Sequence, residues 1–350
     1  MAASELPGEL PGLDPDNLTH YLATKVPDLD DGPLYAELIS EGRSNITYFL
    51  ANDSQQFVLQ RPPLGHVLAT AHDMSREFNV TRALYGSSVP VPKPLHLCQD
   101  EDIIGAPFLL MDYVEGEMIS NLDDAMIVGA SQIPQLSYRF ISTLANLHSI
   151  DPRGIGLAEF GQPDGYLERQ LERWGVQLEA SRSGPTPGID ALGKRLAEWI
   201  PETQRTTIVH GDYRLENVIV AKSDFDQWDI AAVVDWEMST LGDPLADLGL
   251  FALFWSVIGC DPPIPMAGMD AAPPFPSSLD LVATYSDLSG LDLEPMPWYT
   301  ALATFKMAII MEGIVYRHSQ GQTVGDNFGS LRDWIRPLVN SGMAQLDLLR

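Results

Sequence analysis

Carboxylate and amide side chains gather in the stretch Ile208–Asp247. Asp212 and Asn217 share the segment HGDYRLEN, and Asp235 directly follows the apolar run Ile230–Val234. Transfer of a phosphoryl group to an alcohol needs such a set: one carboxylate orients and deprotonates the hydroxyl, while amide and carboxylate oxygens hold Mg²⁺. The residue types therefore predict Asp212 as the catalytic base and Asn217 with Asp235 as Mg²⁺ ligands.

Two further side chains of this stretch carry a hypothesis of their own. Arg214 lies two positions after Asp212 and is predicted to neutralise charge on the transferred group. His210 is interpreted as a buried imidazole that braces the loop rather than as a reacting group. Each of these residues alone would fit an ordinary polar turn, so the hypothesis depends on the whole set.

The elements that must position these residues change in character along the chain. The first third alternates short apolar runs with polar turns, and the remainder has helical spacing, interrupted by two short runs at the motif. The expected strands are Tyr35–Ile39, Ile46–Leu50, Phe57–Leu59, Leu95–Cys98, Phe108–Met111, Val218–Val220 and Ile230–Val234. The expected helices are Asn17–Lys25, Ala69–Tyr85, Tyr138–Ile150, Gly165–Leu178, Ala191–Ile200, Leu245–Ile258, Leu279–Ser286, Trp298–Ser319 and Ser330–Leu349.

This order predicts an α+β protein with two lobes. A flexible arm is expected over residues 1–16, a small lobe with an antiparallel sheet over residues 17–112, and a larger helical lobe over residues 113–350. Asp112–Gly116 is the expected connector, and ligands commonly bind in the cleft between two lobes.

Composition excludes some classes of partner. The formal net charge is −27 over 350 residues, which disfavours nucleic acid and anionic membrane surfaces. It suits a cationic substrate, and it equally suits high solubility. Cys98 and Cys260 are the only cysteines, so no disulfide framework is expected. No signal peptide or membrane-spanning run is predicted, and a cytoplasmic monomer or homodimer is the expectation.

The segments HGDYRLENVIV and VVDWEMSTLGDPLADLG resemble the aminoglycoside phosphotransferase family, which has a protein-kinase-like fold. Within that family the two segments are most similar in sequence to the branch whose kinase domain is also found fused to acyl-CoA dehydrogenases. The resemblance covers roughly residues 30–330 and is most specific over residues 208–250. It implies an ATP- and Mg²⁺-dependent kinase, with GTP as an alternative nucleotide.

The resemblance also implies roles for residues outside the motif. Asp243 and Asp247 would be structural and would tie the segment after the metal site to the catalytic loop. The other implied positions concern the nucleotide: a loop over the phosphates, a residue behind the base, and two backbone contacts to the purine edge. They are Gly42, Ser44 and Asn45 for the loop, Met111 behind the base, and Asp112 and Val114 for the backbone contacts.

One position departs from the protein-kinase pattern. The strand Phe57–Arg61 should carry a lysine for the α- and β-phosphates, and it has none. Strand counting leaves Gln60 or Arg61 at this place, on opposite faces. A neutral amide binds phosphate less well than a cation, so Arg61 is the predicted contact, with Glu77 as its partner.

Fewer residues in the sequence indicate where the acceptor substrate binds. Glu237, Tyr316 and Arg317 are the candidate substrate contacts. The branch implies a hydroxyacyl thioester or related hydroxy acid, which would suit a lobe rich in methionine and aromatic residues. An aminoglycoside or amino alcohol is the alternative acceptor. A nucleotide-binding module without activity is a second class, suggested by the missing lysine. An acyl-CoA-handling oxidoreductase is a weaker one, since no G-x-G-x-x-G segment is present.

Overall fold

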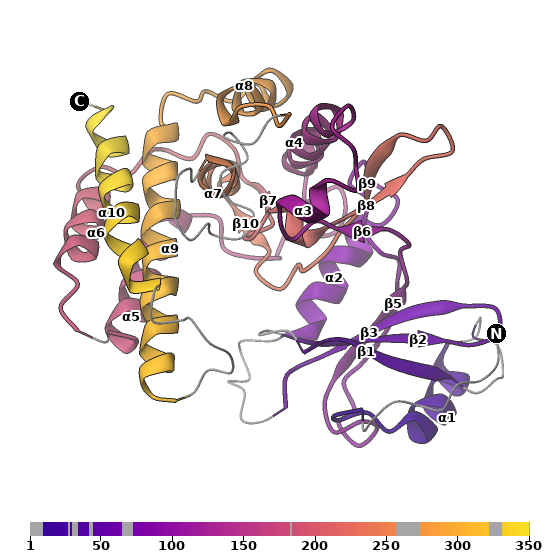
Figure 1. The fold of residues 1–350 in the computed structure, drawn as a ribbon. Helices are drawn as coiled ribbons and strands as arrows, with labels where there is room; N and C mark the ends of the chain where they lie inside the picture. The colour runs from indigo at the N-terminus through magenta and orange to yellow at the C-terminus, as the bar shows by residue number, and fades with distance from the viewer. Residues whose placement is uncertain are drawn as a thin grey trace. The chain divides into compact units, whose positions relative to one another are not determined.

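The computed structural model describes residues 10–26, 29, 34–41, 45–64, 73–182, 184–256, 274–321 and 331–349. The chain forms two compact units (Figure 1). The first comprises Met1–Gly116 and Ala231–Glu237, and the second comprises Glu117–Ile230 and Met238–Arg350. The expected boundary near Asp112 thus lies a few residues later, and a short segment after the motif joins the first unit.

The first unit is built on a five-stranded antiparallel sheet of order β1-β2-β3-β5-β4. Its strands are β1 (Tyr35–Glu41), β2 (Ile46–Ala51), β3 (Gln56–Arg61), β4 (Pro94–Cys98) and β5 (Phe108–Asp112). The predicted meander of three strands is therefore present, and the two strands around the acidic turn complete the same sheet.

A helix lies on each face of this sheet. Helix α1 (Pro15–Lys25) shares a core with the inward side chains Phe57 and Leu59 of β3. Helix α2 (Met74–Leu84) packs on the other face, where Met74 contacts Leu109. Both helices begin at an aspartate whose carboxylate accepts backbone N–H groups of the first turn, as N-caps do.

The expectation of a flexible arm is wrong for its described part. Leu13 is buried in the core under α1, the Tyr48 hydroxyl donates to the carbonyl of Pro11, and the Arg61 guanidinium donates to the carbonyl of Gly12. Residues 10–14 are thus packed onto the sheet, because their apolar side chain and their carbonyls find buried partners there. Residues 1–9 lie outside the described residues.

The second unit is mostly helical. Its helices are α3 (Leu122–Ala125), α4 (Ile133–Ser149), α5 (Tyr166–Ala180), α6 (Pro187–Glu198), α7 (Pro244–Ser256), α8 (Ser278–Ser289), α9 (Met296–Ser319) and α10 (Arg332–Asp347). Two small sheets have the orders β10-β7 and β6-β8-β9. Their strands are β6 (Glu117–Met118), β7 (Thr207–Val209), β8 (Val218–Lys222), β9 (Trp228–Val233, ending in the first unit) and β10 (Thr240–Gly242).

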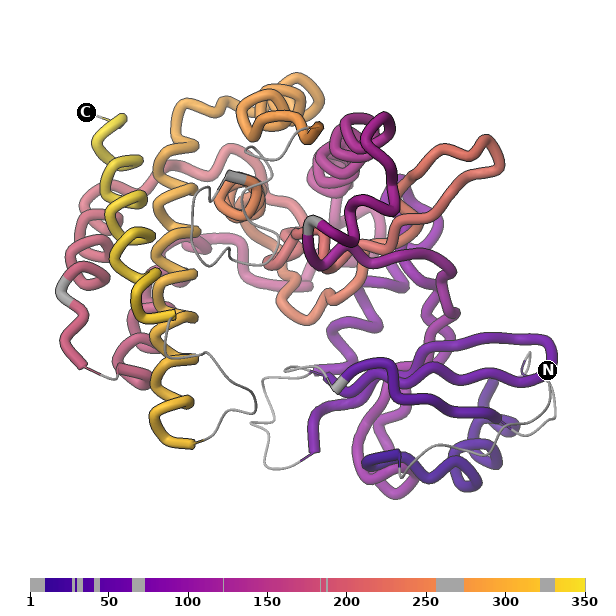
Figure 2. Tube along the Cα trace, in the orientation of Figure 1, coloured from indigo at the N-terminus to yellow at the C-terminus, as the bar shows by residue number. Residues whose placement is uncertain are grey.

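Helix α9 is the central helix of the second unit. It packs against α7 and α10, and Figure 2 traces α9 and α10 side by side. By length and composition α9 could cross a membrane, although no membrane-spanning run is expected from the sequence. However, 72% of the apolar part of α9 is buried within the protein. Its apolar character is thus accounted for by core packing. The α+β class is confirmed.

Candidate active site

Asp212 lies in a tight turn between β7 and the short 3₁₀ helix η1 (Leu215–Asn217). The turn needs glycine at position 211, where φ is +87° and an added Cβ would lie 2.8 Å from the carbonyl oxygen of Met238. After this glycine, the Asp212 N–H donates to Nδ1 of His210 at 3.2 Å. His210 is fully buried, in agreement with the interpretation of its imidazole as a brace.

The Asp212 carboxylate is held by two of the residues that the motif brings near it. Asn217 Nδ2 donates to the Asp212 carbonyl at 2.9 Å and to its Oδ2 at 3.1 Å. Arg214 Nε donates to the same Oδ2 at 3.2 Å, and Arg214 Nη1 pairs with Glu216 Oε2 at 2.6 Å. Because Asn217 uses its amide N–H groups on Asp212, its carbonyl oxygen is the atom that can bind a cation.

Asp247, in the first turn of α7, fixes the backbone of the catalytic turn. Its carboxylate accepts the N–H groups of His210 at 2.6 Å and Gly211 at 2.8 Å. His148 Nε2 lies 3.3 Å from the same carboxylate, and Nδ1 of His148 lies 2.6 Å from the Tyr285 hydroxyl. Burial alone would raise the pKa of Asp247, but the interactions with His148, together with His210 and Gly211, outweigh it and lower that pKa.

Asp243 fixes the start of α7. Its Oδ1 accepts the N–H of Leu245 at 2.9 Å, and its Oδ2 accepts the hydroxyl of Tyr299 at 2.8 Å. The geometry agrees with structural roles for Asp243 and Asp247, since both carboxylates bind groups of the protein itself. Together they connect α7, α9 and the catalytic turn.

Lys306 of α9 contacts the catalytic turn, and no role for it is predicted from the sequence. Its Nζ donates to the carbonyl oxygen of Gly211 at 2.7 Å. The signal available in the sequence is a lone cation in the middle of an apolar helical stretch, Tyr299–Met311. That signal alone does not distinguish a site residue from a solvated one.

The first unit contains Asp235, the other predicted Mg²⁺ ligand. Asp235 follows β9 and adopts the left-handed conformation with φ +64°, which non-glycine residues adopt mainly where the surroundings enforce it. Burial raises the pKa of Glu77 to about 8, and the neighbouring carboxylates of Asp235 and Glu237 add to this rise. Asn45 Nδ2 lies 3.5 Å from Glu237 Oε2, at the limit of a hydrogen bond.

This acidic group suits a cation. The buried oxygens Oδ1 of Asn45 and Oε2 of Glu77 have no hydrogen-bond partner among the described residues. Amide and carboxylate oxygens are atoms that can coordinate a cation. The described residues contain no cluster of three or more metal-ligating side chains. Mg²⁺ takes only one or two protein ligands beside phosphate and water, so an amide oxygen and a carboxylate, the donor types of Asn217 and Asp235, fit its chemistry.

The placement of β3 decides between Gln60 and Arg61. Arg61 is buried on the α1 face, where its guanidinium donates to the carbonyls of Gly12 and of Ile104, the latter at 2.8 Å. Val58, on the opposite face, packs with Met74 of α2, so Gln60 shares the face of α2 and Glu77. The geometry therefore argues against Arg61 as the phosphate contact and for Gln60, because side chains alternate along a strand.

The predicted connector to the base begins where β5 ends. Met111 is buried against Met74 and Leu109. The Asp112 N–H donates to the carbonyl of Lys93 at 2.9 Å, so only the Asp112 carbonyl can serve a purine edge. Val114 follows the strand and lies half-buried. The placement of Met111, Asp112 and Val114 is compatible with their predicted roles, which stay predictions.

The remaining predicted residues are not joined to Asp212. Gly42 and Ser44 lie outside the described residues. Tyr316 is half-buried and Arg317 is exposed at the end of α9. At a rise of about 1.5 Å per residue they lie roughly 15 Å along the helix from Lys306. Lys306, rather than Arg317, is thus the basic side chain of α9 that contacts the turn.

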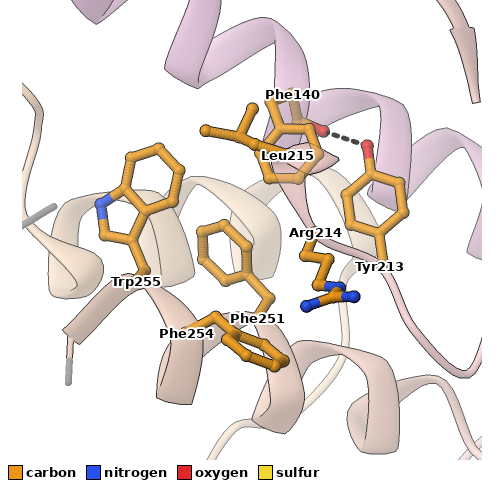
Figure 3. Close-up of a pocket in the computed structure, with 7 residues that line it drawn as sticks. All are labelled: Phe140, Tyr213, Arg214, Leu215, Phe251, Phe254 and Trp255. Carbon is orange, nitrogen blue, oxygen red and sulfur yellow. Dashed lines mark hydrogen bonds between the residues drawn. The ribbon is translucent and has the colours of Figure 1, made fainter. Parts of the chain in front are cut away.

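A shallow aromatic pocket lies beside Arg214 (Figure 3). About 220 Å³ of space lies among its lining side chains, and this volume includes open solvent. The Phe140 and Tyr213 rings are stacked at 4.5 Å, and the Arg214 guanidinium lies 5.4 Å from the Phe254 ring centroid. Leu215, Phe251 and Trp255 complete the lining. The pocket places apolar surface next to a cation in the catalytic turn.

Comparisons with known proteins agree with this geometry. A Ralstonia eutropha crystal structure, assigned only provisionally to the aminoglycoside phosphotransferases, has 29% identity and a TM-score of 0.81, covering 95% of this chain and 98% of that one. The APH(2″)-IIIa structure with GDP and kanamycin has 15% identity and a TM-score of 0.59, covering 94% and 97%. The fold and the site thus define a phosphotransferase of the protein-kinase-like class.

The chain belongs to the phosphotransferase enzyme family, whose model matches residues 36–272. Acyl-CoA dehydrogenase family member 11 of Gallus gallus is 32% identical over 344 residues, covering 94% of this chain and 43% of the relative. Acyl-CoA dehydrogenase IBR3 of Arabidopsis thaliana, an assignment itself given as probable, is 31% identical over 331 residues, covering 88% and 39%. The chain spans about two fifths of the length of these relatives.

Proposed function

We propose that this chain is an ATP- and Mg²⁺-dependent kinase that phosphorylates a hydroxyl group of a small hydroxyacyl-type molecule, CoA-linked forms included. The observation that carries the proposal is the Asp212 carboxylate, held by Asn217 at 3.1 Å and Arg214 at 3.2 Å on a turn that Asp247 fixes. Family membership supports the phosphotransferase reaction. The identity of the acceptor is the proposal's further step.

Each residue of the turn has one task in this reaction. Asp212 orients the acceptor hydroxyl and takes its proton as the new bond forms. Arg214 balances negative charge beside Asp212. The Asn217 carbonyl oxygen and the Asp235 carboxylate would hold Mg²⁺. Bound MgATP would supply the phosphoryl group. GTP stays an alternative, since related structures carry GDP as well as AMP-PNP and ADP.

Local charge and apolar surface support a hydroxyacyl acceptor. The aromatic side chains beside Arg214 give this part of the second unit an apolar character that would suit an acyl chain. Arg173 and Arg214 both act electrostatically on Lys306, and the carboxylates of Asp212 and Asp247 act on it as well. These cations make an anionic acceptor compatible with a chain that is strongly acidic as a whole. The relatives with acyl-CoA dehydrogenase names point in the same direction.

Two alternatives have observations of their own. An aminoglycoside or amino-alcohol acceptor is favoured by the similar structure from Ralstonia eutropha and by the net charge of −27. A nucleotide-binding module without turnover is favoured by Gln60, a neutral side chain on the face where a phosphate-binding cation is expected.

A phosphotransfer screen with mass-spectrometric detection separates these functions. Hydroxyacyl-CoAs, free hydroxy acids, amino alcohols and aminoglycosides are incubated with ATP and Mg²⁺. The proposal predicts phosphorylated hydroxyacyl products from the wild-type chain. Turnover of aminoglycosides alone would contradict the proposed acceptor. Nucleotide binding in a thermal-shift assay without turnover of any acceptor would support the inactive module instead.

A further inference from the structure

Lys306 carries a cation into an apolar helix next to the catalytic turn. The neighbouring side chains Phe305, Ala308 and Ile309 of α9 are buried in the core. Burial lowers the pKa of Lys306, while the carboxylates of Asp212 and Asp247 raise it. A lysine in such surroundings costs stability unless its charge has partners. Its hydrogen-bond partner and the carboxylates that attract it belong to the catalytic turn and to α7, which supports that turn.

The position of the ammonium group bears directly on Asp212. Its hydrogen bond goes to the carbonyl oxygen of Gly211, at 2.7 Å. That carbonyl belongs to the peptide unit that joins Gly211 to Asp212, and the N–H of the same unit donates to His210 Nδ1 at 3.2 Å. Because a peptide unit is planar, holding both of its polar ends fixes its orientation. The direction in which the Asp212 side chain leaves the backbone follows from that orientation.

The side chain of Lys306 is itself held in place. Its Nζ lies 5.5 Å from the ring centroid of Trp174 on α5, within cation–π range. The charged groups that face it are Arg173 from α5, Asp212 and Arg214 from the catalytic turn, and Asp247 from α7. Among these, the carboxylates attract the ammonium, and Asp247 is already bound to the backbone of the turn.

We infer that Lys306 is a positioning residue of the phosphotransfer reaction, which fixes the orientation of the Gly211–Asp212 peptide. This inference rests on the proposed function. Lys306 acts through the turn and needs no contact with the acceptor.

The test compares Lys306→Met, which keeps length but removes charge and donor, with Lys306→Arg, which retains both. Lys194→Met on α6 is the control, since Lys194 is exposed. In Lys306→Met we expect kcat to fall about 10- to 100-fold, as small misplacements of a catalytic group do, while nucleotide affinity stays the same. Lys306→Arg should recover part of kcat, because it restores a donor and a positive charge at this position.

Hydrogen–deuterium exchange gives a second readout that does not need turnover. The peptide covering residues 208–214 should exchange faster in Lys306→Met than in the wild type and in Lys194→Met. Unchanged exchange in this peptide would overturn the inference. If the wild type phosphorylates no acceptor, the proposed function fails. Faster exchange confined to Lys306→Met would then still support the positioning of the turn by Lys306. Unchanged exchange would refute that positioning.

Discussion

Gln60 and Arg61 are neighbours on β3, yet their surroundings differ completely. Arg61 donates to backbone carbonyls under α1, whereas Gln60 faces the helix that carries Glu77. The sequence alone could not separate them, because a bend at Pro62 and Pro63 allows either register. The register of β3 with β5, Leu59 opposite Leu110, settles which face each side chain takes.

Substitution of these two neighbours should give opposite results. Gln60→Lys places a cation near the buried Glu77, and we expect ATP to bind about 1–2 kcal/mol more tightly through charge-assisted contacts. Arg61→Met should leave ATP affinity unchanged and lower the free energy of unfolding by about 1–3 kcal/mol, because two buried carbonyls lose their donor. Calorimetric titration and denaturant unfolding measure the two quantities. Weaker ATP binding in Arg61→Met would restore Arg61 as the phosphate contact.

Asp247 links its protonation to stability. Its pKa is lowered in the folded chain, so its carboxylate stabilises the fold above the ordinary carboxyl range, and this contribution is lost as the pH falls through the folded pKa. Asp247→Asn should therefore lower the free energy of unfolding by about 1.5–3 kcal/mol at pH 7. The difference from the wild type should shrink below about pH 4.

Chemical unfolding at several pH values checks this prediction. Asp287→Asn is a suitable control, because Asp287 is an exposed aspartate of α8. It removes the same charge without touching the catalytic turn. A constant difference between Asp247→Asn and the wild type from pH 7 down to pH 3 would show that the charge of Asp247 does not matter for stability.

At the scale of elements, the periodicity of apolar residues predicts the long helices and the longer strands, but it does not predict short pairs of strands. The antiparallel pair β7 and β10 has three residues in each strand, too few for a pattern to emerge. Helix α4 begins at Ile133, before the predicted Tyr138, because Pro134 is favourable in a first turn. The catalytic turn is predictable because the whole set of residue types at this spacing, rather than any one of them, indicates phosphoryl transfer.

The contact between α7 and α9 depends on a glycine. A Cβ on Gly249 would lie 2.6 Å from the backbone carbonyl oxygen of Tyr299, so the helices must separate to accommodate it. Gly249→Ala should destabilise the chain by about 1–3 kcal/mol. Gly175→Ala on α5 meets no atom within 4 Å and should stabilise it by about 0.5–1 kcal/mol, since alanine is the better helix former.

Denaturant unfolding of both variants provides the comparison. Since α7 carries Asp247 and α9 carries Lys306, Gly249→Ala should also lower any phosphotransfer activity, and Gly175→Ala should not. Equal effects of the two alanines on stability would contradict the close approach of α7 and α9.

At the scale of the whole molecule, the sequence predicts two lobes but not the assignment of every segment. Residues 231–237, which comprise the end of β9 and the residues after it, belong to the first unit although the flanking chain belongs to the second. The chain therefore passes from the second unit into the first and back within the stretch that carries Asp235. Local patterns cannot predict this, because it depends on contacts between residues far apart in sequence.

The net charge of the whole molecule does not determine the charge of its substrate. A net charge of −27 suggests a cationic ligand, yet Arg173 and Arg214 both act electrostatically on Lys306, which contacts the catalytic turn. The substrate responds to the local arrangement at short range, because at physiological ionic strength distant charges are screened beyond about 8 Å. An anionic acceptor is therefore compatible with an acidic protein.

The most direct test of the proposed reaction is the mass of a hydroxyacyl-CoA after incubation with ATP, Mg²⁺ and either the wild-type chain or Asp212→Asn. We predict that the wild type adds one phosphoryl group to the acyl hydroxyl. Asp212→Asn should still bind ATP but react at least about 100-fold more slowly, as loss of a general base requires. Equal rates for the two chains would contradict the assignment of Asp212 as the base on which the account rests.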